Sequence, residues 1–499
     1  MRTLLFSILF MLLSPANAQG FRAYCETSGN INSTNRDVIE TSPGNYMSWA
    51  VGISYENGKG YYRINVFGLN NSGQQVWMKK YGTANWNYFS YHFTNRSFYK
   101  HNNHVYIATT LLDSLNNYSA ILLKFDFQGN LLWQKVIQDT AQQLFPMRVV
   151  SSIDGGFLIT GMAQKGSHEH VFCLKTDSLG NKIWLKNYLL DIKRSQARCL
   201  LQDSATGKII FTGVLSYSGA SWSDTKSMVL VTDSAGNYIN MKHHYSGLNM
   251  DMINHGKGKY LMVGETDWYS AFLTRKPHAL LYDINNINTP IWQYEYGTEQ
   301  LEHGFTSIDQ WDDSTYIVSG FIDTTWLVKS GHANTNLKYS FLSENGRIKK
   351  ELIYNYRQDT TIDFARTPRT VLKTSDGGWI ATVSNSYNDT IAYYIKYDAN
   401  GCDSTLNYCL TVGLKEQVKK GVELFPNPAN DVVQVMLPEE SNQVFTITLV
   451  DVAGREVLQQ TNLLNHHSIK IDALPAGLYL VKIMQAGILV HSAKLIKTD

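Results

Sequence analysis

The chain of 499 residues is poor in charge, in proline and in long apolar runs. Charged residues make up 17% of it, below the roughly 25% of an average soluble protein. The net charge is only +2 and no basic run stands out, which argues against a nucleic-acid partner. No stretch beyond the N-terminus reaches the roughly 18 apolar residues of a membrane-spanning helix, so we expect no transmembrane segment in the mature protein.

The sequence also lacks the short motifs of several common enzyme classes. It contains no Gly-x-Ser-x-Gly elbow, no His-Glu-x-x-His zinc helix and no Cys-x-x-Cys. Residues 52–60 are similar to a phosphate-binding loop, but they contain one spacer residue too many, and Gly60 stands where Ser or Thr must meet magnesium. From the sequence we therefore assign no catalytic residue, no metal ligand and no cofactor.

Two histidines, His168 and His170, are the best candidates for metal ligands, because alternate residues of a strand share one face. No Asp or Cys partner is identifiable nearby, so we interpret residues 168–170 as a solvated polar loop. The paired carboxylates of a glycoside hydrolase must lie roughly 5 to 10 Å apart across a cleft, a distance that sequence alone does not supply.

Tyrosine (30) and tryptophan (11) are plentiful, which is typical of an all-β protein with many short strands. A pattern built on a Gly-Gly turn, or its equivalent, recurs through residues 36–410. Its spacings of 59, 52, 52, 51, 56 and 63 residues give seven copies. The apolar residue that follows the turn falls at Tyr46, Val105, Phe157, Ile209, Tyr260, Tyr316 and Trp379.

A second turn, of the form Asp-x-x-Gly or similar, recurs in six copies and is irregular at residues 283–288 of the fifth. Glycine supplies the positive φ that such turns need, and Asp can accept a hydrogen bond from the backbone two residues on. Tryptophan follows this turn in four copies, where we expect it to pack between repeats. These residues are Trp77, Trp133, Trp184 and Trp292.

Each copy holds four short runs suited to strands, which in the third copy are residues 148–152, 157–161, 171–176 and 182–188. Four strands in roughly 50 residues make one propeller blade, and blades must stack to bury both faces. We therefore predict an all-β fold, with a seven-bladed β-propeller over residues 19–410. A strand from residues 19–40 is expected to close the ring by pairing with the last blade. Six or eight blades stay open as alternatives because the first and last copies are irregular, and an open solenoid is disfavoured because no polar capping repeat is visible.

The connections after the second strand of each blade should lie on one face of the ring, and they carry aromatic residues. Rigid aromatic side chains suit sugar rings or peptide side chains. The alternative interpretation is that these rings fold inward and cover blade edges. The candidate ligand-binding residues are Tyr55, Tyr118, Trp222, Trp268, Trp326 and Tyr387.

The N-terminal residues 1–18 have the pattern of a secretory signal peptide. Arg2 supplies the positive charge, residues 4–13 form the apolar region, and Ala16-Asn-Ala18 is the expected cleavage site. Export would permit disulfides.

Of the five cysteines, Cys402 and Cys409 enclose six residues and make the best disulfide pair. Closing so short a loop would stabilise the fold by about 2–3 kcal/mol, chiefly by restricting the unfolded chain. For Cys173 and Cys199, which lie in apolar strand-like runs, we favour buried thiols over a second disulfide.

Residues 411–421 are polar and out of register with the repeat, so we predict a linker there and a separate domain over residues 422–499. Short alternating runs separated by turn residues predict a small Ig-like β-sandwich. The runs are residues 432–437, 445–450, 468–471, 478–483 and 488–496.

This last segment resembles, over its whole length, the C-terminal sorting domain of type IX secretion substrates of the Bacteroidetes. The residues that match the family's motifs, in order, are Pro426, Asn427, Pro428, Asp451, Gly454, Gly477, Tyr479, Lys494 and Lys497. The resemblance implies passage through the periplasm, recognition by the outer-membrane translocon, and then attachment to the cell surface or release. The alternative is an Ig-like accessory module with no sorting role.

Taken together, these features favour a secreted or cell-surface propeller protein that binds a glycan or a protein without catalysis. The alternative is a polysaccharide hydrolase or lyase with its site at the propeller channel, because propellers host both kinds of function. A structural part of a gliding or adhesion surface is a third possibility. Two or more buried, convergent carboxylates or histidines with shifted pKa values at a channel mouth would favour the enzyme.

Overall fold

The computed structural model describes most of the chain between residues 20 and 498, and all regular structure in the described residues is β-strand. It divides into two compact units, Met1–Leu410 and Thr411–Asp499. The described part contains no helix of the length and apolarity that a membrane crossing requires. The described residues are 20–26, 34–83, 86–89, 96–189, 192–217, 225–266, 275–297, 302–323, 335–354, 366–385, 391–403, 423–436, 445–451, 455–463, 467–485 and 488–498.

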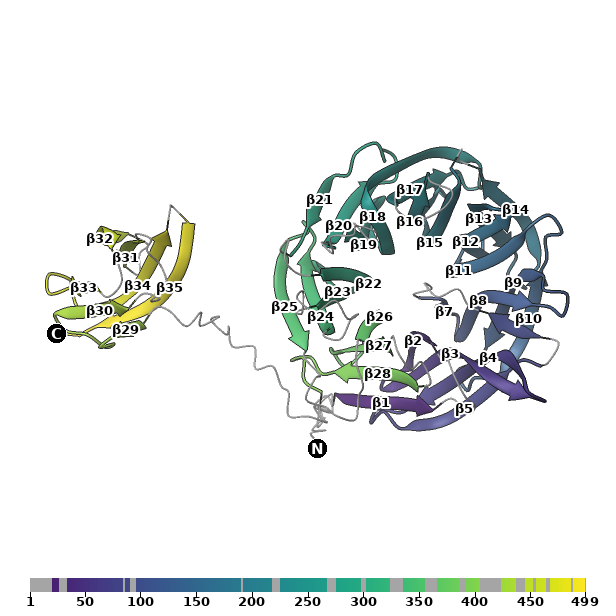
Figure 1. Ribbon diagram of the computed structural model, residues 1–499, viewed down its shortest axis with the longest axis horizontal. Helices are drawn as coiled ribbons and strands as arrows, with labels where there is room; N and C mark the ends of the chain where they lie inside the picture. Colours follow the sequence, from purple (N-terminus) through teal and green to yellow (C-terminus); the bar gives the residue numbers. More distant parts are fainter. Residues whose placement is uncertain are drawn as a thin grey trace, which may run out of the picture. The chain divides into compact units, whose positions relative to one another are not determined.

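In the first unit, short antiparallel sheets follow one another around a propeller-like ring (Figure 1). Its early strands are β1 (Phe21–Glu26), β2 (Thr34–Ser42), β3 (Asn45–Glu56), β4 (Lys59–Leu69), β5 (Gln75–Tyr81), β6 (Asn87–Phe89), β7 (Phe98–His101), β8 (His104–Leu112), β9 (Tyr118–Phe125), β10 (Leu131–Ile137), β11 (Gln143–Ser151), β12 (Phe157–Lys165), β13 (His168–Thr176) and β14 (Lys182–Tyr188). The later ones are β15 (Arg194–Gln202), β16 (Ile209–Ser216), β17 (Lys226–Thr232), β18 (Tyr238–Gly256), β19 (Lys259–Thr266), β20 (Pro277–Asp283), β21 (Trp292–Glu295), β22 (Glu302–Asp312), β23 (Thr315–Asp323), β24 (Thr335–Ser343), β25 (Ile348–Tyr354), β26 (Arg366–Lys373), β27 (Trp379–Asn385) and β28 (Ile391–Tyr397).

The strands pair mostly with their sequence neighbours, as the repeat predicts. β2 to β5 form one sheet, β22 to β25 another, and β8 pairs with β9 and with both β6 and β7. From β11 to β21 the pairing is continuous for two reasons. β13 pairs with β15 at Glu169 and Arg194, and the 19-residue strand β18 pairs with β17 through its first part and with β19 through its second. The four strands predicted for the third copy are confirmed as β11 to β14, three of them longer than predicted.

The ring closes through its N-terminal strand. β1 pairs antiparallel with β28, so the last sheet has the order β1-β28-β27-β26 (Figure 1). This confirms the predicted pairing of a strand from residues 19–40 with the last repeat. The pairing joins the two ends of the repeat region, so residues from both ends build the last sheet.

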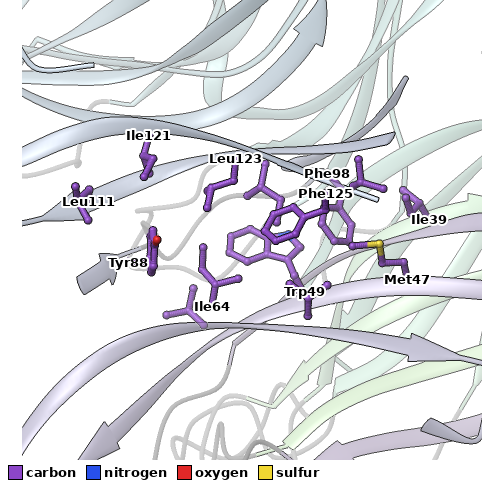
Figure 2. Close-up of a cluster of buried hydrophobic side chains, with 14 residues drawn as sticks. Ile39, Met47, Trp49, Ile64, Tyr88, Phe98, Leu111, Ile121, Leu123 and Phe125 are labelled. Atoms are coloured by element: carbon purple, nitrogen blue, oxygen red, sulfur yellow. The ribbon is translucent and has the colours of Figure 1, made fainter. Parts of the chain in front are cut away.

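The hydrophobic core is divided into clusters that lie between neighbouring sheets. Figure 2 shows one of them, in which Met47 and Trp49 of β3 face Leu123 and Phe125 of β9. A comparable cluster joins the closing sheet to the β2–β5 sheet and includes Phe21 of β1. Each sheet is therefore buried on both faces only in the presence of its neighbours, as expected of stacked repeats.

Tryptophans of the outer strands pack against turn glycines of the next sheet, which confirms their predicted place between repeats. A Cβ on Gly236 would lie 2.7 Å from the ring of Trp184, and one on Gly346 would lie 2.7 Å from Trp292. Gly236 has a φ of +76°, so its turn needs glycine for its backbone as well as for the close approach. Trp77 approaches Gly129, and Trp133 approaches Gly180, in the same way.

A tyrosine four residues after three of these positions adds a hydrogen bond to the contact. The hydroxyl of Tyr188 donates to the carbonyl of Gly236 (3.0 Å), and that of Tyr296 donates to the carbonyl of Gly346 (2.7 Å). Tyr81 makes the corresponding bond to Gly129. We call the aromatic ring, the glycine and, where present, the tyrosine an outer clasp.

The irregular fifth repeat has a different contact. The amide of Asn240, at the position of the missing tryptophan, lies 3.5 Å from Asn288 in the turn that lacks the usual glycine. Here the two neighbouring sheets share the uninterrupted strand β18. The loss of the tryptophan and the loss of the glycine therefore occur together, on the two sides of one contact.

The second unit contains two sheets that enclose one core. Residues of both sheets, such as Val433, Ile447 and Val481, belong to the same buried cluster. The first sheet has the order β29-β30-β33 and the second β32-β31-β34-β35. Its strands are β29 (Glu423–Phe425), β30 (Val432–Met436), β31 (Phe445–Val450), β32 (Glu456–Leu463), β33 (His467–Lys470), β34 (Gly477–Gln485) and β35 (Ile488–Lys497).

One sequence interpretation is wrong and several lie outside the described residues. Residues 168–170 begin strand β13 rather than form a solvated loop, with Glu169 and His170 buried. Cys173 and Cys199 are buried free thiols, as favoured. The proposed signal peptide, the linker 411–421 and Cys409 are outside the described part of the chain, so the Cys402–Cys409 disulfide stays a prediction.

Candidate functional site

The guanidinium of Arg96 connects sheets from several sides of the ring. Arg96 precedes β7, and its Nε lies 3.1 Å from Asp251 Oδ2 of β18 and 3.2 Å from Ser307 Oγ of β22. Its Nη2 donates to the carbonyl of Val371 in β26 (2.8 Å) and lies 3.5 Å from Asp309. Because β7, β22 and β26 face the middle of the ring (Figure 1), one side chain that precedes β7 contacts strands of three other sheets there.

Asp251 is the carboxylate at the centre of this network, and both of its oxygens are occupied. Oδ1 accepts from the backbone N–H of Met252 (2.9 Å) and lies 3.7 Å from Arg148. Oδ2 accepts from Ser307 Oγ (2.9 Å) and from the backbone N–H of Ile308 (3.1 Å). Donors of neighbouring strands and side chains therefore engage both oxygens of this buried carboxylate.

Asp37 occupies a comparable position in β2. It accepts from its neighbour Val38 N (2.8 Å) and, with the other oxygen, from Phe98 N (2.9 Å) in the next sheet. Burial raises the pKa of Asp37 to about 7, although both backbone donors and the charges of Arg96 and Arg148 favour its ionised form. The carboxylate therefore joins two sheets at a large desolvation cost.

The centre of the ring thus contains buried, convergent carboxylates, the feature expected of the enzymatic alternative. Their oxygens, however, are bonded to arginines, serine and backbone donors of neighbouring strands. These contacts assign Asp37 and Asp251 to the joining of sheets. We call this group, Asp37, Arg96, Arg148, Asp251, Ser307 and Asp309, the central network.

A polar pocket of about 490 Å³ lies between the sheet that contains β9 and the sheet that contains β12. Five of its twelve lining residues are Asn or Gln, and Asp139 and Lys165 add one charge of each sign. The lining residues are Asn117, Tyr118, Ser119, Gln138, Asp139, Thr140, Ala141, Gln142, Gln143, Gln164, Lys165 and Gly166.

Hydrogen bonds hold the side chain of Gln142 in one orientation. Its Nε2 donates to Asp139 Oδ2 (2.7 Å) and to Asn187 Oδ1 (3.2 Å), so its Oε1 faces His170 Nε2 at 3.0 Å. An amide oxygen only accepts, so His170 must donate from Nε2. Burial lowers the pKa of His170 and keeps the ring neutral at pH 7. The wall of the pocket is therefore fixed before any ligand arrives.

The lining is suited to a ligand rich in hydroxyl groups. An amide side chain carries both donors and an acceptor. Gln142 and Asp139 already form bonds within the wall, whereas Gln138, Gln143 and Gln164 bring further amides to the lining. Tyr118 adds an aromatic surface, and its ring is held against Phe145 with centroids 5.0 Å apart. Lys165 and Gln164 come from the hairpin between β12 and β13, so the pocket is built by the connections of two adjacent sheets.

The structure describes two of the six aromatic residues predicted to bind a ligand. Tyr118 lines the pocket, whereas Tyr55 is 53% exposed near the end of the β3–β4 hairpin and is not part of its lining. The other four, Trp222, Trp268, Trp326 and Tyr387, lie outside the described residues.

Sequence reasoning missed the amide groups of the pocket. Gln138, Gln142 and Gln143 fall within six residues directly after β10, in the chain that leads to the next sheet. This local enrichment was the available signal. Because amides have no titratable chemistry, such an enrichment does not by itself indicate a site.

In the second unit, residues of the Pro-Asn-Pro motif contact the last strand. Asn427 Nδ2 donates to the carbonyl of Lys494 (2.7 Å), and Asn427 Oδ1 accepts from Ile496 N (2.9 Å). The hydroxyl of the buried Tyr479 donates to the carbonyl of Pro475 (2.7 Å).

The remaining motif residues are spread over this unit. Asp451 accepts from the backbone and the guanidinium of Arg455, and Gly477 begins β34. Gly454 lies outside the described residues. Only some of the motif residues are therefore in contact with each other. Asn427 contacts Lys494, whereas Asp451 forms hydrogen bonds within its own turn.

Comparison with known families identifies the second unit. Residues 423–498 match the family model described as the secretion system C-terminal sorting domain, which confirms the resemblance to type IX sorting domains. The chain therefore carries a tail that directs it to the outer cell surface or to secretion, and that interacts with the secretion machinery. A search of curated proteins finds no significant match for the chain.

Solved structures similar to the chain are distant. They include cobalt-substituted Synechocystis ACO, with 12% identity, a TM-score of 0.38, and coverage of 61% of this chain and 71% of that one. The WD40 domain of SCAP from fission yeast has 8% identity and a TM-score of 0.33 over 76% and 98% of the two chains. An α-L-arabinanase from Penicillium chrysogenum has 12% identity and a TM-score of 0.35 over 77% and 99%. At such low scores these likenesses carry no argument about activity.

Proposed function

We propose that the chain is a seven-bladed β-propeller, over residues 19–410, joined by a linker at 411–421 to an Ig-like sorting domain over 422–499. The strand pairing supports seven blades if β18 is counted in two of them, as the outer strand of the fourth and the inner strand of the fifth. After removal of a signal peptide of residues 1–18, the tail would be recognised by the outer-membrane translocon from the periplasmic side.

The function that the geometry supports best is non-catalytic binding of a glycan at the polar pocket beside Tyr118. The observation that carries this proposal is a preformed pocket with five amide side chains among its twelve lining residues, together with one aromatic ring and one carboxylate. Sugar hydroxyls donate and accept at once, as these side chains do. Peptides bound through apolar anchors would require a more apolar lining.

The carboxylates support binding over hydrolysis. Hydrolysis of a glycosidic bond needs a pair of carboxyl groups across the substrate, and Asp139 is the single carboxylate in the described lining of the pocket. The buried carboxylates at the centre of the ring are bonded to donors of neighbouring strands. A hydrolase or lyase at the propeller channel is the second candidate, and its support is the raised pKa of Asp37.

The test measures binding of neutral oligosaccharides to the purified full-length protein by isothermal titration calorimetry. The panel contains cello-, xylo-, arabino- and chito-oligosaccharides of four to six units, with release of reducing ends followed in the same samples. We expect saturable binding of at least one member without cleavage. Tyr118→Ala and Gln164→Ala should each weaken it at least tenfold, whereas Tyr238→Ala, an exposed tyrosine on an outer strand, should not change it.

Several results would contradict this proposal. Absence of binding across the panel, or equal binding by Tyr118→Ala, would remove the glycan site from the pocket. Release of reducing ends would favour the hydrolase. The triple variant Trp222→Ala, Trp268→Ala and Trp326→Ala tests the other proposed aromatic residues, and a loss of binding confined to that variant would move the site to their face of the ring.

A further inference from the structure

The sorting domain exposes a compact apolar patch on one face of its larger sheet. Leu478 and Leu480 of β34 and Ile496 of β35 are 45%, 39% and 47% exposed. The residues between them, Tyr479 and Leu495, are buried, so the strands alternate and these three side chains share the outward face. Exposed apolar clusters on small soluble domains often mark a binding surface.

The strand register makes the patch contiguous. Leu478 lies directly opposite Ile496, and Leu480 lies directly opposite Lys494. Side chains directly opposite on neighbouring strands are in contact range. We call these four residues, Leu478, Leu480, Lys494 and Ile496, the tail patch.

The Pro-Asn-Pro motif closes the neighbouring sheet edge and leaves the face free. β35 is the last strand of its sheet, and such an edge could accept a strand from a partner. Asn427 already bonds the backbone of Lys494 and Ile496, and Ala429 bonds Ile496 and Thr498. The motif therefore fixes the strand that presents the patch and prevents strand addition at that end.

Two lysines of β34 and β35 lie within or next to the patch. Lys494 is exposed within it, and the half-buried Lys482 follows on the same face of β34. The other terminal lysine, Lys497, points inward and its Nζ lies 3.4 Å from Asn430 Oδ1. Of the two lysines in the motif, Lys494 alone is available to a partner, whereas Lys497 serves the fold of the domain.

We propose that the tail patch is the surface by which the secretion machinery recognises this chain, and that its partner presents an apolar surface with acidic groups at its rim. We infer this partner because residues 423–498 match a sorting domain and because the patch combines exposed apolar groups with a cation. It concerns export and does not depend on ligand binding by the ring.

The test follows export of the full-length chain in a bacterium with an active type IX secretion system. The variant Leu478→Ser, Leu480→Ser and Ile496→Ser removes the apolar part of the patch. The matched control Val76→Ser, Leu132→Ser and Ile183→Ser changes three exposed apolar residues on strands of the ring. We expect the patch variant to show at least a tenfold lower surface and medium fraction, with accumulation in the periplasm, while the control is exported normally.

A charge variant keeps the test decisive if the triple variant fails to fold. Lys494→Glu changes one exposed side chain, so it should slow export several-fold with limited proteolysis of the tail unchanged, and Lys494→Arg should be exported normally. Normal export of the triple variant, or of Lys494→Glu, would overturn the proposal. The proposal would also be overturned if patch variants were exported at the normal rate but no longer self-associated in light scattering. The patch would then be a contact between copies of the chain.

Discussion

Neighbouring sheets of the ring are joined differently at its centre and along its outer strands. At the centre, Arg96 and Asp251 form a buried ionic network that links several sheets. Along the outside, a tryptophan or tyrosine of one sheet meets a turn glycine of the next, and this contact recurs with the repeat. The outer clasp is built from packing and neutral hydrogen bonds, whereas the central network depends on charges taken out of water.

The difference predicts different responses to mutation. Loss of one clasp leaves the others in place and removes a limited amount of packing. Loss of one ion from the central network leaves its partners buried and unpaired, which costs more than the pair contributes. Replacing single residues in each region therefore measures how far the ring depends on its charged centre.

The largest effect is expected for Arg96→Met. The change keeps an apolar stem but removes the charge that faces Asp251 and Asp309, so the free energy of unfolding of the ring should fall by about 3–5 kcal/mol. Urea unfolding followed by circular dichroism measures it. The control Lys100→Met removes an exposed cation that donates to Glu40 and Thr41 of the preceding sheet, and should cost less than about 1 kcal/mol. Equal losses in the two variants would mean that the centre is no more critical than the surface.

A smaller effect is expected when one outer clasp is opened. Trp184→Ala removes the ring that covers Gly236 and part of the cluster around Leu230, so the free energy of unfolding should fall by about 2–3 kcal/mol. Its exposed neighbour Ile183 provides the control, since Ile183→Ala should cost less than about 0.5 kcal/mol. A loss at Trp184 larger than that at Arg96 would reverse the comparison.

The dependence of stability on pH separates the two regions further. The pKa of Asp37 is about 7 in the folded protein, above the value of about 3.9 expected in the unfolded chain. The folded state therefore keeps a proton that the unfolded chain loses. The stability from this group is fully present below about pH 4 and is lost as the pH rises to 7, by at most about 1.4 kcal/mol per pH unit.

Asp37→Asn isolates this contribution. The free energy of unfolding of the variant minus that of the wild type should increase between pH 4 and pH 7 and then level off. Burial lowers the pKa of His278 to about 3 and that of His303 to about 4, and these groups act in the opposite direction, but equally in both proteins. A difference that is constant with pH would show that Asp37 is ionised throughout, and the desolvation argument would be wrong.

The outer clasps were within reach of sequence reasoning and the central network was not. The repeat placed Trp77, Trp133, Trp184 and Trp292 near each outer strand and the glycines in turns, so their contact follows once sheets are stacked. Closure by a strand near the N-terminus followed from the same argument. Arg96, Arg148 and Asp251 each stand nine residues before the apolar residue that marks their copy of the repeat. Because these side chains differ from copy to copy, the repeat did not indicate that they meet. Asp251 and Val371 lie 155 and 275 positions after Arg96 in the sequence.

The polar pocket and the tail were also only partly predictable from the sequence. The amides of the pocket come from three connections with no pattern in common, and only the fold brings Gln142 and Gln164 together. His170 was misinterpreted because alternation within 168–170 was too short to distinguish a strand from a loop. In the tail, the motifs identified the family, but the contact between Asn427 and Lys494 spans 67 positions and needed coordinates.

The finest comparison uses a single hydroxyl of an outer clasp. Tyr188→Phe removes the bond to the carbonyl of Gly236 and leaves the ring in place, so the free energy of unfolding should fall by about 0.5–1.5 kcal/mol. The control Tyr238→Phe removes an exposed hydroxyl and should have no measurable effect. The preceding clasp already has Ile137 where this tyrosine would stand, so the ring tolerates its absence at one contact. A loss near that of Trp184→Ala would mean that the hydrogen bond, rather than the packing of the indole on glycine, holds the outer strands together.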